Sequence, residues 1–192
     1  YDPAGPMEFG PYEQWIQART GAAVTRVRDA LDTYRFNEYA SELYQFTWGE
    51  FCDWYLELAK TVLYDDDASP ARKNGTKHTL YTTLGAVARM LHPSMPFFSE
   101  ELWSRLPGER PMLTTQPFPT AAEFPSDDAA LVQVAAMQAA VTEVRRIRGE
   151  MEIARKVALT VLVGDADLCA ALQHHGAALE HLTNVTIEPL VE

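Results

Sequence analysis

The sequence predicts a mainly α-helical fold: an antiparallel helical bundle that carries a small C-terminal α/β unit of βαβ-like pattern. Two observations lead to this fold class. Apolar residues recur at the spacing of amphipathic helices from about residue 12 to residue 151, and a β-branched run follows at residues 157–163. The change of pattern after Lys156 predicts two domains, a helical one at residues 1–152 and a small α/β appendage at residues 153–192.

Five helices are predicted in the helical domain. They span about residues 12–34, 36–64, 77–91, 96–106 and 127–151. The second gives the strongest helical signal, since it has no proline and a single glycine, Gly49. The Asp, Ser and Pro residues at 65–70 should end it, and Asn74 with Gly75 should continue the loop. A proline-rich connection is expected between the fourth and fifth helices.

The appendage is predicted as a strand, a helix and a second strand. Gly164 and Asp165 end the β-branched run at residues 157–163, and a helix is expected at about residues 166–182. A short strand at residues 185–187 is then closed by Pro189. Strands that alternate with a helix in this way are typical of a parallel sheet.

Composition limits the class of protein. The 192 residues are 47% apolar, enough for a globular core, and no apolar run is long enough for a membrane span. The net charge of −11 argues against non-specific binding of nucleic acid, which depends on a basic surface. Two cysteines without a Cys-x-x-Cys pattern favour a reducing compartment, so we expect a cytoplasmic protein. The start lacks an initiator Met and a signal peptide, which suggests a segment of a longer protein or a processed chain.

The second predicted helix is rich in aromatic residues, with eight between Phe36 and Tyr55. At about 100° per residue, one stripe collects six apolar side chains, which we expect in the core. They are Tyr44, Trp48, Phe51, Tyr55, Leu58 and Val62.

Two aromatics lie off this stripe. Phe46 lies nearly opposite it, on the side of charged residues such as Arg35, and Trp54 lies at its polar edge, near Glu50. An exposed aromatic flanked by charges is what base stacking requires. The alternative is that a neighbouring helix covers this side. We favour that alternative for Phe46, and both remain open for Trp54.

Three stretches then carry a family resemblance. Residues 34–60 include the run Asp-Trp-Tyr-Leu-Glu-Leu, residues 91–103 read His-Pro-Ser-Met-Pro-Phe-Phe-Ser-Glu-Glu-Leu-Trp after Leu91, and residues 144–151 read Val-Arg-Arg-Ile-Arg-Gly-Glu-Met. Together they resemble the anticodon-binding domain of valyl-tRNA synthetases over nearly the whole chain from about Gln14. The Glu-Glu-Leu-Trp motif is shared with leucyl and isoleucyl relatives, whereas the His-Pro-x-Met-Pro-Phe form favours the valyl family.

The resemblance implies a function. The chain would recognise the anticodon stem-loop of valine tRNA and position that tRNA for ATP-dependent aminoacylation by a catalytic domain elsewhere in the synthetase. The two ATP-contacting motifs of such a domain, His-Ile-Gly-His and Lys-Met-Ser-Lys-Ser, are absent from this sequence, as is any glycine-rich phosphate loop. We therefore expect no catalytic residue and no cofactor in this chain, which would act as a monomer alongside the rest of the synthetase.

Eight residues are candidates for RNA contact. They are Arg35, Phe46, Glu50, Asp53, Trp54, Lys60, Arg145 and Arg148. The last two belong to a basic cluster at residues 145–156, which could contact phosphates or could pair with Glu143, Glu150 and Glu152 on a solvated helix face. His174, His175 and His181 share a predicted helix without further ligands at useful spacing, so no metal site is expected.

Two other functions remain open. The net charge favours a freestanding helical protein-interaction module descended from a synthetase. The third reading is the anticodon domain of an isoleucyl or leucyl enzyme.

Overall fold

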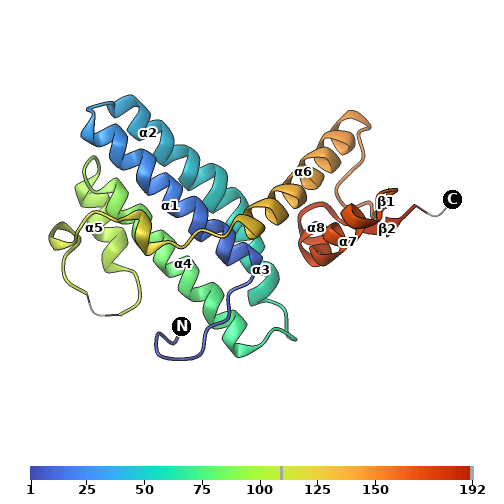
Figure 1. The fold of residues 1–192 in the computed structure, drawn as a ribbon, viewed down its shortest axis with the longest axis horizontal. Helices are drawn as coiled ribbons and strands as arrows, with labels where there is room; N and C mark the ends of the chain where they lie inside the picture. Colours follow the sequence, from blue (N-terminus) through green and yellow to red (C-terminus); the bar gives the residue numbers. More distant parts are fainter. Residues whose placement is uncertain (109, 191–192) are drawn as a thin grey trace. The chain divides into compact units, whose positions relative to one another are not determined.

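A computed structural model describes residues 1–108 and 110–190. The chain forms two compact units, Tyr1–Asp127 and Asp128–Glu192, and each is described by itself below. The mainly helical fold with a small C-terminal α/β unit is confirmed (Figure 1).

The first unit is a helical bundle. Its α-helices are α1 (Pro11–Asp32), α2 (Phe36–Tyr44), α3 (Leu56–Leu63), α4 (Pro70–Leu91) and α5 (Pro96–Ser104). The π-helical segment η1 (Gln45–Tyr55) joins α2 to α3, so residues 36–63 form one long helix, as the sequence predicted. The long helix and α4 both pack against α1, and α5 packs against α4 (Figure 1). The short 3-10 turns η2 (Leu113–Thr115) and η3 (Ala121–Glu123) lie in the proline-rich connection.

The third predicted helix begins seven residues earlier than expected, at Pro70 instead of Lys77. Ser69 is its N-cap, because the Ser69 Oγ accepts a hydrogen bond from the Arg72 backbone N–H at 3.0 Å. Pro70 takes the first helical position, where its missing N–H costs nothing. The same residues that signal the end of one helix therefore begin the next.

Asn74 and Gly75 were expected in a loop, and this expectation was wrong. Both lie inside α4, where they hold the N-terminal segment. The Asn74 side chain donates to the carbonyl oxygens of Asp2 and Pro6 at 2.8 and 3.1 Å. A Cβ at Gly75 would lie 2.1 Å from the carbonyl oxygen of Glu8, so only glycine lets this backbone approach so closely.

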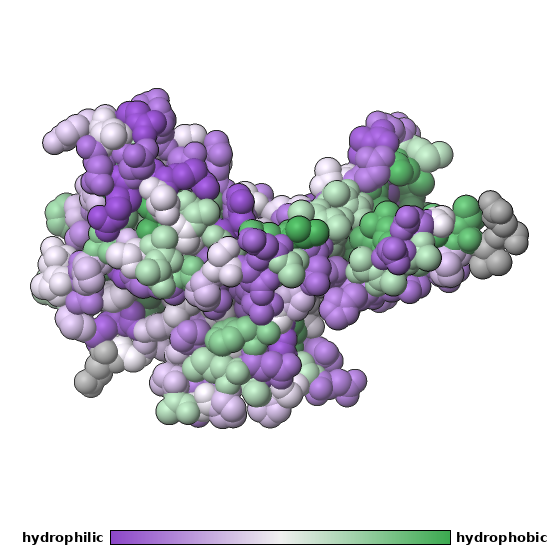
Figure 2. All heavy atoms as spheres, viewed as in Figure 1, coloured by the Kyte–Doolittle hydropathy of each residue, from purple (hydrophilic) through white to green (hydrophobic). Residues whose placement is uncertain are grey.

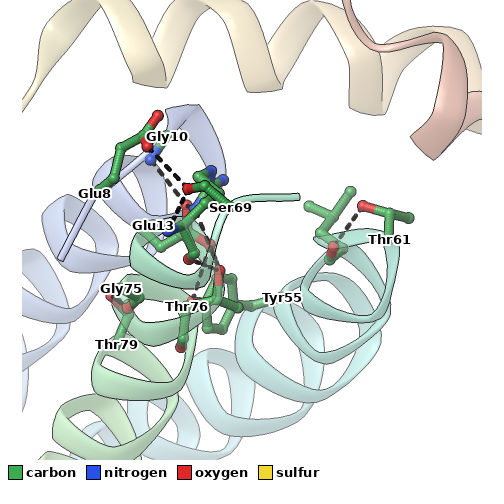
Figure 3. A network of polar contacts seen from close by, with 11 residues as sticks. Glu8, Gly10, Glu13, Tyr55, Thr61, Ser69, Gly75, Thr76 and Thr79 are labelled. Carbon is green, nitrogen blue, oxygen red and sulfur yellow. Dashed lines mark hydrogen bonds and ion pairs between the residues drawn. The ribbon is translucent and has the colours of Figure 1, made fainter. Parts of the chain in front are cut away.

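A buried polar network ties α1 to α4 (Figure 3). Glu13 is fully buried and forms an ion pair with Arg72 at 2.6 Å. Its carboxylate also accepts hydrogen bonds from the Gly10 backbone N–H at 3.0 Å and from Thr76 Oγ1 at 2.9 Å. Because a buried charge is costly unless it is paired and hydrogen-bonded, this network makes Glu13 tolerable inside the bundle.

The second unit contains α6 (Asp128–Glu150), β1 (Leu159–Val163), α7 (Ala166–His174), α8 (Gly176–Thr183) and β2 (Val185–Pro189). The two strands pair in parallel, with Leu159 opposite Val185 and Val163 opposite Pro189. The connection that was predicted as one helix is divided into α7 and α8 at His175. The expected βαβ-like pattern is otherwise present.

Helix α6 groups with the α/β elements. It contacts α7 and α8, and the buried side of α6 carries Val134, Met137 and Val141. Contacts therefore divide the chain before α6, at Asp127/Asp128, whereas the sequence pattern suggested a boundary at 152/153. Whether residues 1–152 fold as a domain stays a prediction.

No helix in the described parts of the chain is both long enough and apolar enough to cross a membrane.

Candidate nucleic-acid interface

The long helix carries most of the candidate residues, and its register changes in the middle. Upstream of the change, Tyr39, Leu43 and Phe46 are buried; downstream, the buried series continues from Phe51 to Tyr55. The five-residue step from Phe46 to Phe51 falls in η1, where hydrogen bonds of the i→i+5 type add about one residue to the turn. The buried face is therefore displaced by one residue relative to a regular α-helix.

This displacement corrects the predicted core stripe. Phe51, Tyr55, Leu58 and Val62 are buried as expected. Tyr44 and Trp48 are 65% and 54% exposed, so their assignment to the core was wrong. Phe46 is only 1% exposed, and the favoured core assignment is confirmed. Its burial removes Phe46 from the residues available to RNA.

The turn between α1 and α2 presents an aromatic ring and a charge to solvent. Tyr34 is 79% exposed and has a backbone φ of 58°, in the left-handed region that bulky residues rarely adopt. Its ring meets Phe36 edge-on, with centroids 6.2 Å apart. Arg35 lies between Tyr34 and Phe36 in the sequence. Hydrophilic residues gather over this end of the two helices (Figure 2).

The Arg35 guanidinium is held in place by its neighbours. It forms ion pairs with Asp29 on α1 and Glu38 on α2, and its Nε donates to Thr33 Oγ1 at 2.8 Å. The Arg35 side chain is still 43% exposed. The turn therefore offers solvent a flat ring, a guanidinium and two carboxylates. We call Asp29, Tyr34, Arg35 and Glu38 the turn cluster.

Trp54 lies farther along the long helix, in η1. It is partly buried, and Asp53 beside it is exposed. Nineteen residues separate Trp54 from Arg35, which is about 28 Å along the helix axis at 1.5 Å per residue. The structure therefore separates the predicted candidates into two groups.

Two charged candidates on this helix are already paired. The Glu50 carboxylate accepts hydrogen bonds from Nε and Nη2 of Arg19, both at 2.6 Å. This is a two-point contact between η1 and α1. Lys60 donates to Glu57 at 2.6 Å within its own helix. Glu50 therefore fixes α1 against η1, and Lys60 is only partly available for a phosphate.

The two arginine candidates of the second unit have different surroundings. Arg145 is exposed, whereas Arg148 is 7% exposed. The Arg148 guanidinium donates to the carbonyl oxygens of Ala154, Val157 and Asn184 at 3.0, 2.7 and 3.2 Å. Its donors thus hold the connection between α6 and β1, and the burial argues against a role in RNA contact.

The neighbouring Arg146, which was not a candidate, pairs with Glu143 and with Glu150 on the same helix. These hydrogen bonds raise the pKa of Arg146. The expected pairing of the basic cluster with acidic residues on a solvated helix face is therefore found at Arg146.

In residues 1–108 and 110–190, no group of three or more His, Cys, Asp or Glu side chains is arranged to hold a metal ion. His174 and His175 do lie together, with ring centroids 5.3 Å apart, and burial lowers the pKa of His175.

A comparison with known protein families gives the decisive observation. A family profile described as the anticodon-binding domain of tRNA ligase matches residues 13–163. The chain belongs to this anticodon-binding family. The match runs through both compact units, from α1 to the end of β1.

Curated relatives of this anticodon-binding chain are valine–tRNA ligases. The enzyme of Syntrophotalea carbinolica is 43% identical over 159 residues, which are 80% of this chain and 18% of the relative. The enzymes of Geobacter sulfurreducens and Desulfotalea psychrophila are 40% and 35% identical, over 86% and 94% of this chain and 19% and 20% of theirs. The resemblance to the valyl family is thus confirmed, and the chain spans about a fifth of the length of these relatives.

The sequence pattern did not indicate Tyr34 as a surface feature of this anticodon-binding domain. The first predicted helix runs to Tyr34, because a tyrosine at this position is compatible with an ordinary helical backbone. Helix α1 ends two residues earlier, at Asp32, and Tyr34 takes the left-handed conformation that reverses the chain. A three-residue link between two long helices was the available signal, because so short a turn commonly needs one residue with positive φ.

Proposed function

We propose that this chain is the tRNA anticodon-recognition module of a valine–tRNA ligase. In this proposal it holds the anticodon stem-loop of valine tRNA, while a catalytic domain elsewhere in the enzyme uses ATP to attach valine. Family membership supports the class of function, and the valine–tRNA ligase relatives support the amino acid. The turn cluster is the single structural feature on which the contact with the anticodon rests.

The chemistry of the turn cluster suits unpaired bases. A nucleobase can stack on the exposed ring of Tyr34, since stacking needs a flat face and no net positive charge. The Asp29 and Glu38 carboxylates can accept hydrogen bonds from base amino groups, and Arg35 can donate to a base edge or a phosphate. Base recognition of this kind is compatible with a net charge of −11.

A second contact is proposed near Trp54 and Asp53, with Lys60 close by on the same helix. The partly buried indole of Trp54 would stack on a base or ribose, and Lys60 would exchange Glu57 for a phosphate. At about 28 Å from Arg35, this contact would involve a different part of the tRNA from the one held by the turn cluster. Arg145, on the second unit, is proposed as a phosphate contact.

The rest of the assignment follows from the same proposal. The chain itself would need no ATP, and it would work as a monomer joined to the remainder of the synthetase. Because tRNA charging serves translation, we propose a cytoplasmic location, which agrees with two cysteines that remain free thiols.

The test measures binding of the purified chain to a valine tRNA transcript and to a non-cognate tRNA. Tyr34→Ala should weaken valine tRNA binding by about 1–3 kcal/mol, the contribution of one lost stack. The matched control is Tyr34→Phe, which keeps the flat ring and should bind valine tRNA as the wild type does. Equal binding by wild type and Tyr34→Ala would remove the turn cluster from the site.

Arg35→Ala and Trp54→Ala complete this test. Arg35→Ala should weaken binding, and a flatter salt dependence would assign Arg35 to a phosphate and not to a base edge. Trp54→Ala should weaken binding by about 1–3 kcal/mol if its indole stacks on the tRNA. A Trp54→Ala chain that binds valine tRNA as tightly as the wild type would exclude the second contact.

A further inference from the structure

An apolar groove of about 820 Å³ runs along the first unit between the long helix and the pair α4–α5. Tyr44 and Trp48 form one wall, Met95 and Phe98 form the other, and the buried Leu43 lies in the lining. All side chains that line it in the described part of the chain are uncharged. We infer that this groove is the docking site for an apolar α-helix from the remainder of the valine–tRNA ligase, outside this sequence.

The exposure of the groove identifies it as an unfilled interface. Tyr44, Trp48 and Phe98 are 65%, 54% and 56% exposed, although each is a large aromatic residue. Soluble monomers rarely leave a continuous apolar surface of this kind open to water, and such surfaces commonly mark a docking partner. The one-residue displacement in η1 is what turns Tyr44 and Trp48 out of the core and into this wall.

The dimensions of the groove match a helix. Its lining extends along the long helix from Phe36 to Cys52, which is about 24 Å at 1.5 Å per residue. A helix of about four turns that lies along this length would insert side chains at i, i+3, i+4 and i+7 between the two walls.

The chemistry of the lining disfavours RNA as the occupant. Proteins that hold single strands combine stacking aromatics with cations that follow the phosphates, and this groove has no cation. The Tyr39 hydroxyl is already paired, at 2.8 Å, with the carbonyl oxygen of Met90 and with Ser94 Oγ. The Thr47 Oγ1 is buried and has no partner among the described residues, whereas the Tyr44 hydroxyl and the Trp48 indole N–H belong to exposed side chains of the wall. The docked helix should therefore be mainly apolar.

The source of the helix is the large part of the relatives that this chain lacks. The matched segments make up 18–20% of three valine–tRNA ligases, so about four-fifths of each enzyme has no counterpart here. The anticodon module of such an enzyme must also be attached to the rest of it. This inference rests on the proposed function in that it takes the parent protein to be a valine–tRNA ligase.

Cys52 provides a built-in reporter. It lines the groove and is partly exposed, whereas Cys169 is 3% exposed in the second unit. The probe is the S. carbinolica valine–tRNA ligase from which the matched 159 residues have been removed. The rate of Cys52 labelling by a maleimide is measured by mass spectrometry with and without this probe, and saturating probe should slow it at least tenfold.

Adjacent residues on α5 supply matched variants. Phe98 lines the groove, whereas Phe97 is 91% exposed and does not. Phe98→Asp should abolish the protection of Cys52, and Phe97→Asp should leave it intact. Trp48→Glu, on the opposite wall, should act as Phe98→Asp does. Circular dichroism checks that each variant is folded. Because binding in trans can be weak, a chimera with this chain grafted into the S. carbinolica enzyme gives a second measurement of the same protection.

Other outcomes would overturn the inference. Unchanged labelling with both the probe and the chimera would show that no helix of the enzyme covers the groove. Protection by valine tRNA alone would make it an RNA surface, and protection that rises with chain concentration, together with a dimer in sedimentation, would make it a self-association surface. For the wild-type chain, absence of protection with tRNA binding retained would refute only the docking inference, whereas protection without tRNA binding would refute only the proposed recognition of tRNA.

Discussion

Arg148 shows how a residue that resembles a phosphate ligand in the sequence can have a structural role. An arginine beside other arginines on a predicted helix suggests a basic surface, but helical spacing turns Arg148 onto the buried side of α6. There its guanidinium donates to three backbone carbonyl oxygens of residues that lie outside the helices and strands. Periodicity could have predicted this, since Val141, Val144 and Arg148 follow one another at helical spacing.

This role gives a prediction for Arg148→Ala. Removal of the guanidinium takes three hydrogen bonds from part-buried carbonyl oxygens, of which those of Ala154 and Asn184 keep a backbone N–H donor, so the free energy of unfolding should fall by about 1–3 kcal/mol. The control is Arg146→Ala, whose ion pairs with Glu143 and Glu150 are on the solvated face and should contribute little. Urea denaturation of the two variants makes the comparison. Equal stabilities would mean that water replaces the Arg148 donors.

Tyr12 connects a single hydroxyl to the pH dependence of stability. Burial, and to a lesser degree the charge of Glu13, raise the pKa of Tyr12 from 10.0 to about 12. The folded state therefore prefers the neutral phenol. The stabilisation is fully present below pH 10 and is lost as the pH rises through 12.

We expect the wild-type free energy of unfolding to fall by about 2 kcal/mol more than that of Tyr12→Phe between pH 10 and 12. Urea titrations of both proteins at several pH values in this range measure the difference. Parallel curves for the two proteins would show that Tyr12 ionises equally in the folded and unfolded states.

At the scale of elements, the long helix shows which part of the fold sequence patterns cannot give. Its extent was predicted correctly, because apolar periodicity and the loop after Tyr64 define both ends. Its exposed face was not, because a helical wheel assumes one angle per residue and η1 changes that angle. The error therefore affects Tyr44, upstream of the change, and Trp48, within it, while Phe51 and Tyr55 downstream were assigned correctly.

The register of this helix can be tested with two neighbouring aromatics. Phe46→Ala removes a ring that is 1% exposed and should cost about 3–5 kcal/mol of stability. Tyr44→Ala removes a ring that is 65% exposed and should cost well under half as much. Denaturant unfolding of both variants decides between the registers. A larger loss of stability for Tyr44→Ala than for Phe46→Ala would show that the helix keeps the regular α-helical register, with Tyr44 in the core.

At the scale of the whole molecule, fold class and family were accessible from the sequence, but the packing of α6 was not. Periodicity identifies α6 as an amphipathic helix without saying which elements cover its apolar side. The change from helical to strand-like spacing after Lys156 suggested a boundary there. The contacts of α6 with α7 and α8 show that a helix can precede such a change and still belong to the following unit.

The division at Asp127/Asp128 predicts how the chain can be cut. A fragment of residues 128–192 retains α6 with its partners α7 and α8, so it should unfold cooperatively in urea. A fragment of residues 153–192 has only about 40 residues and loses α6, which contacts the helix α8 that carries the buried Leu179 and Leu182. Domains of this size rarely hold a core without further support. This fragment should show little structure by circular dichroism and no cooperative transition. If both fragments unfold with the same midpoint, α6 contributes nothing to the α/β elements, and the boundary belongs at 152/153 as the sequence pattern indicated.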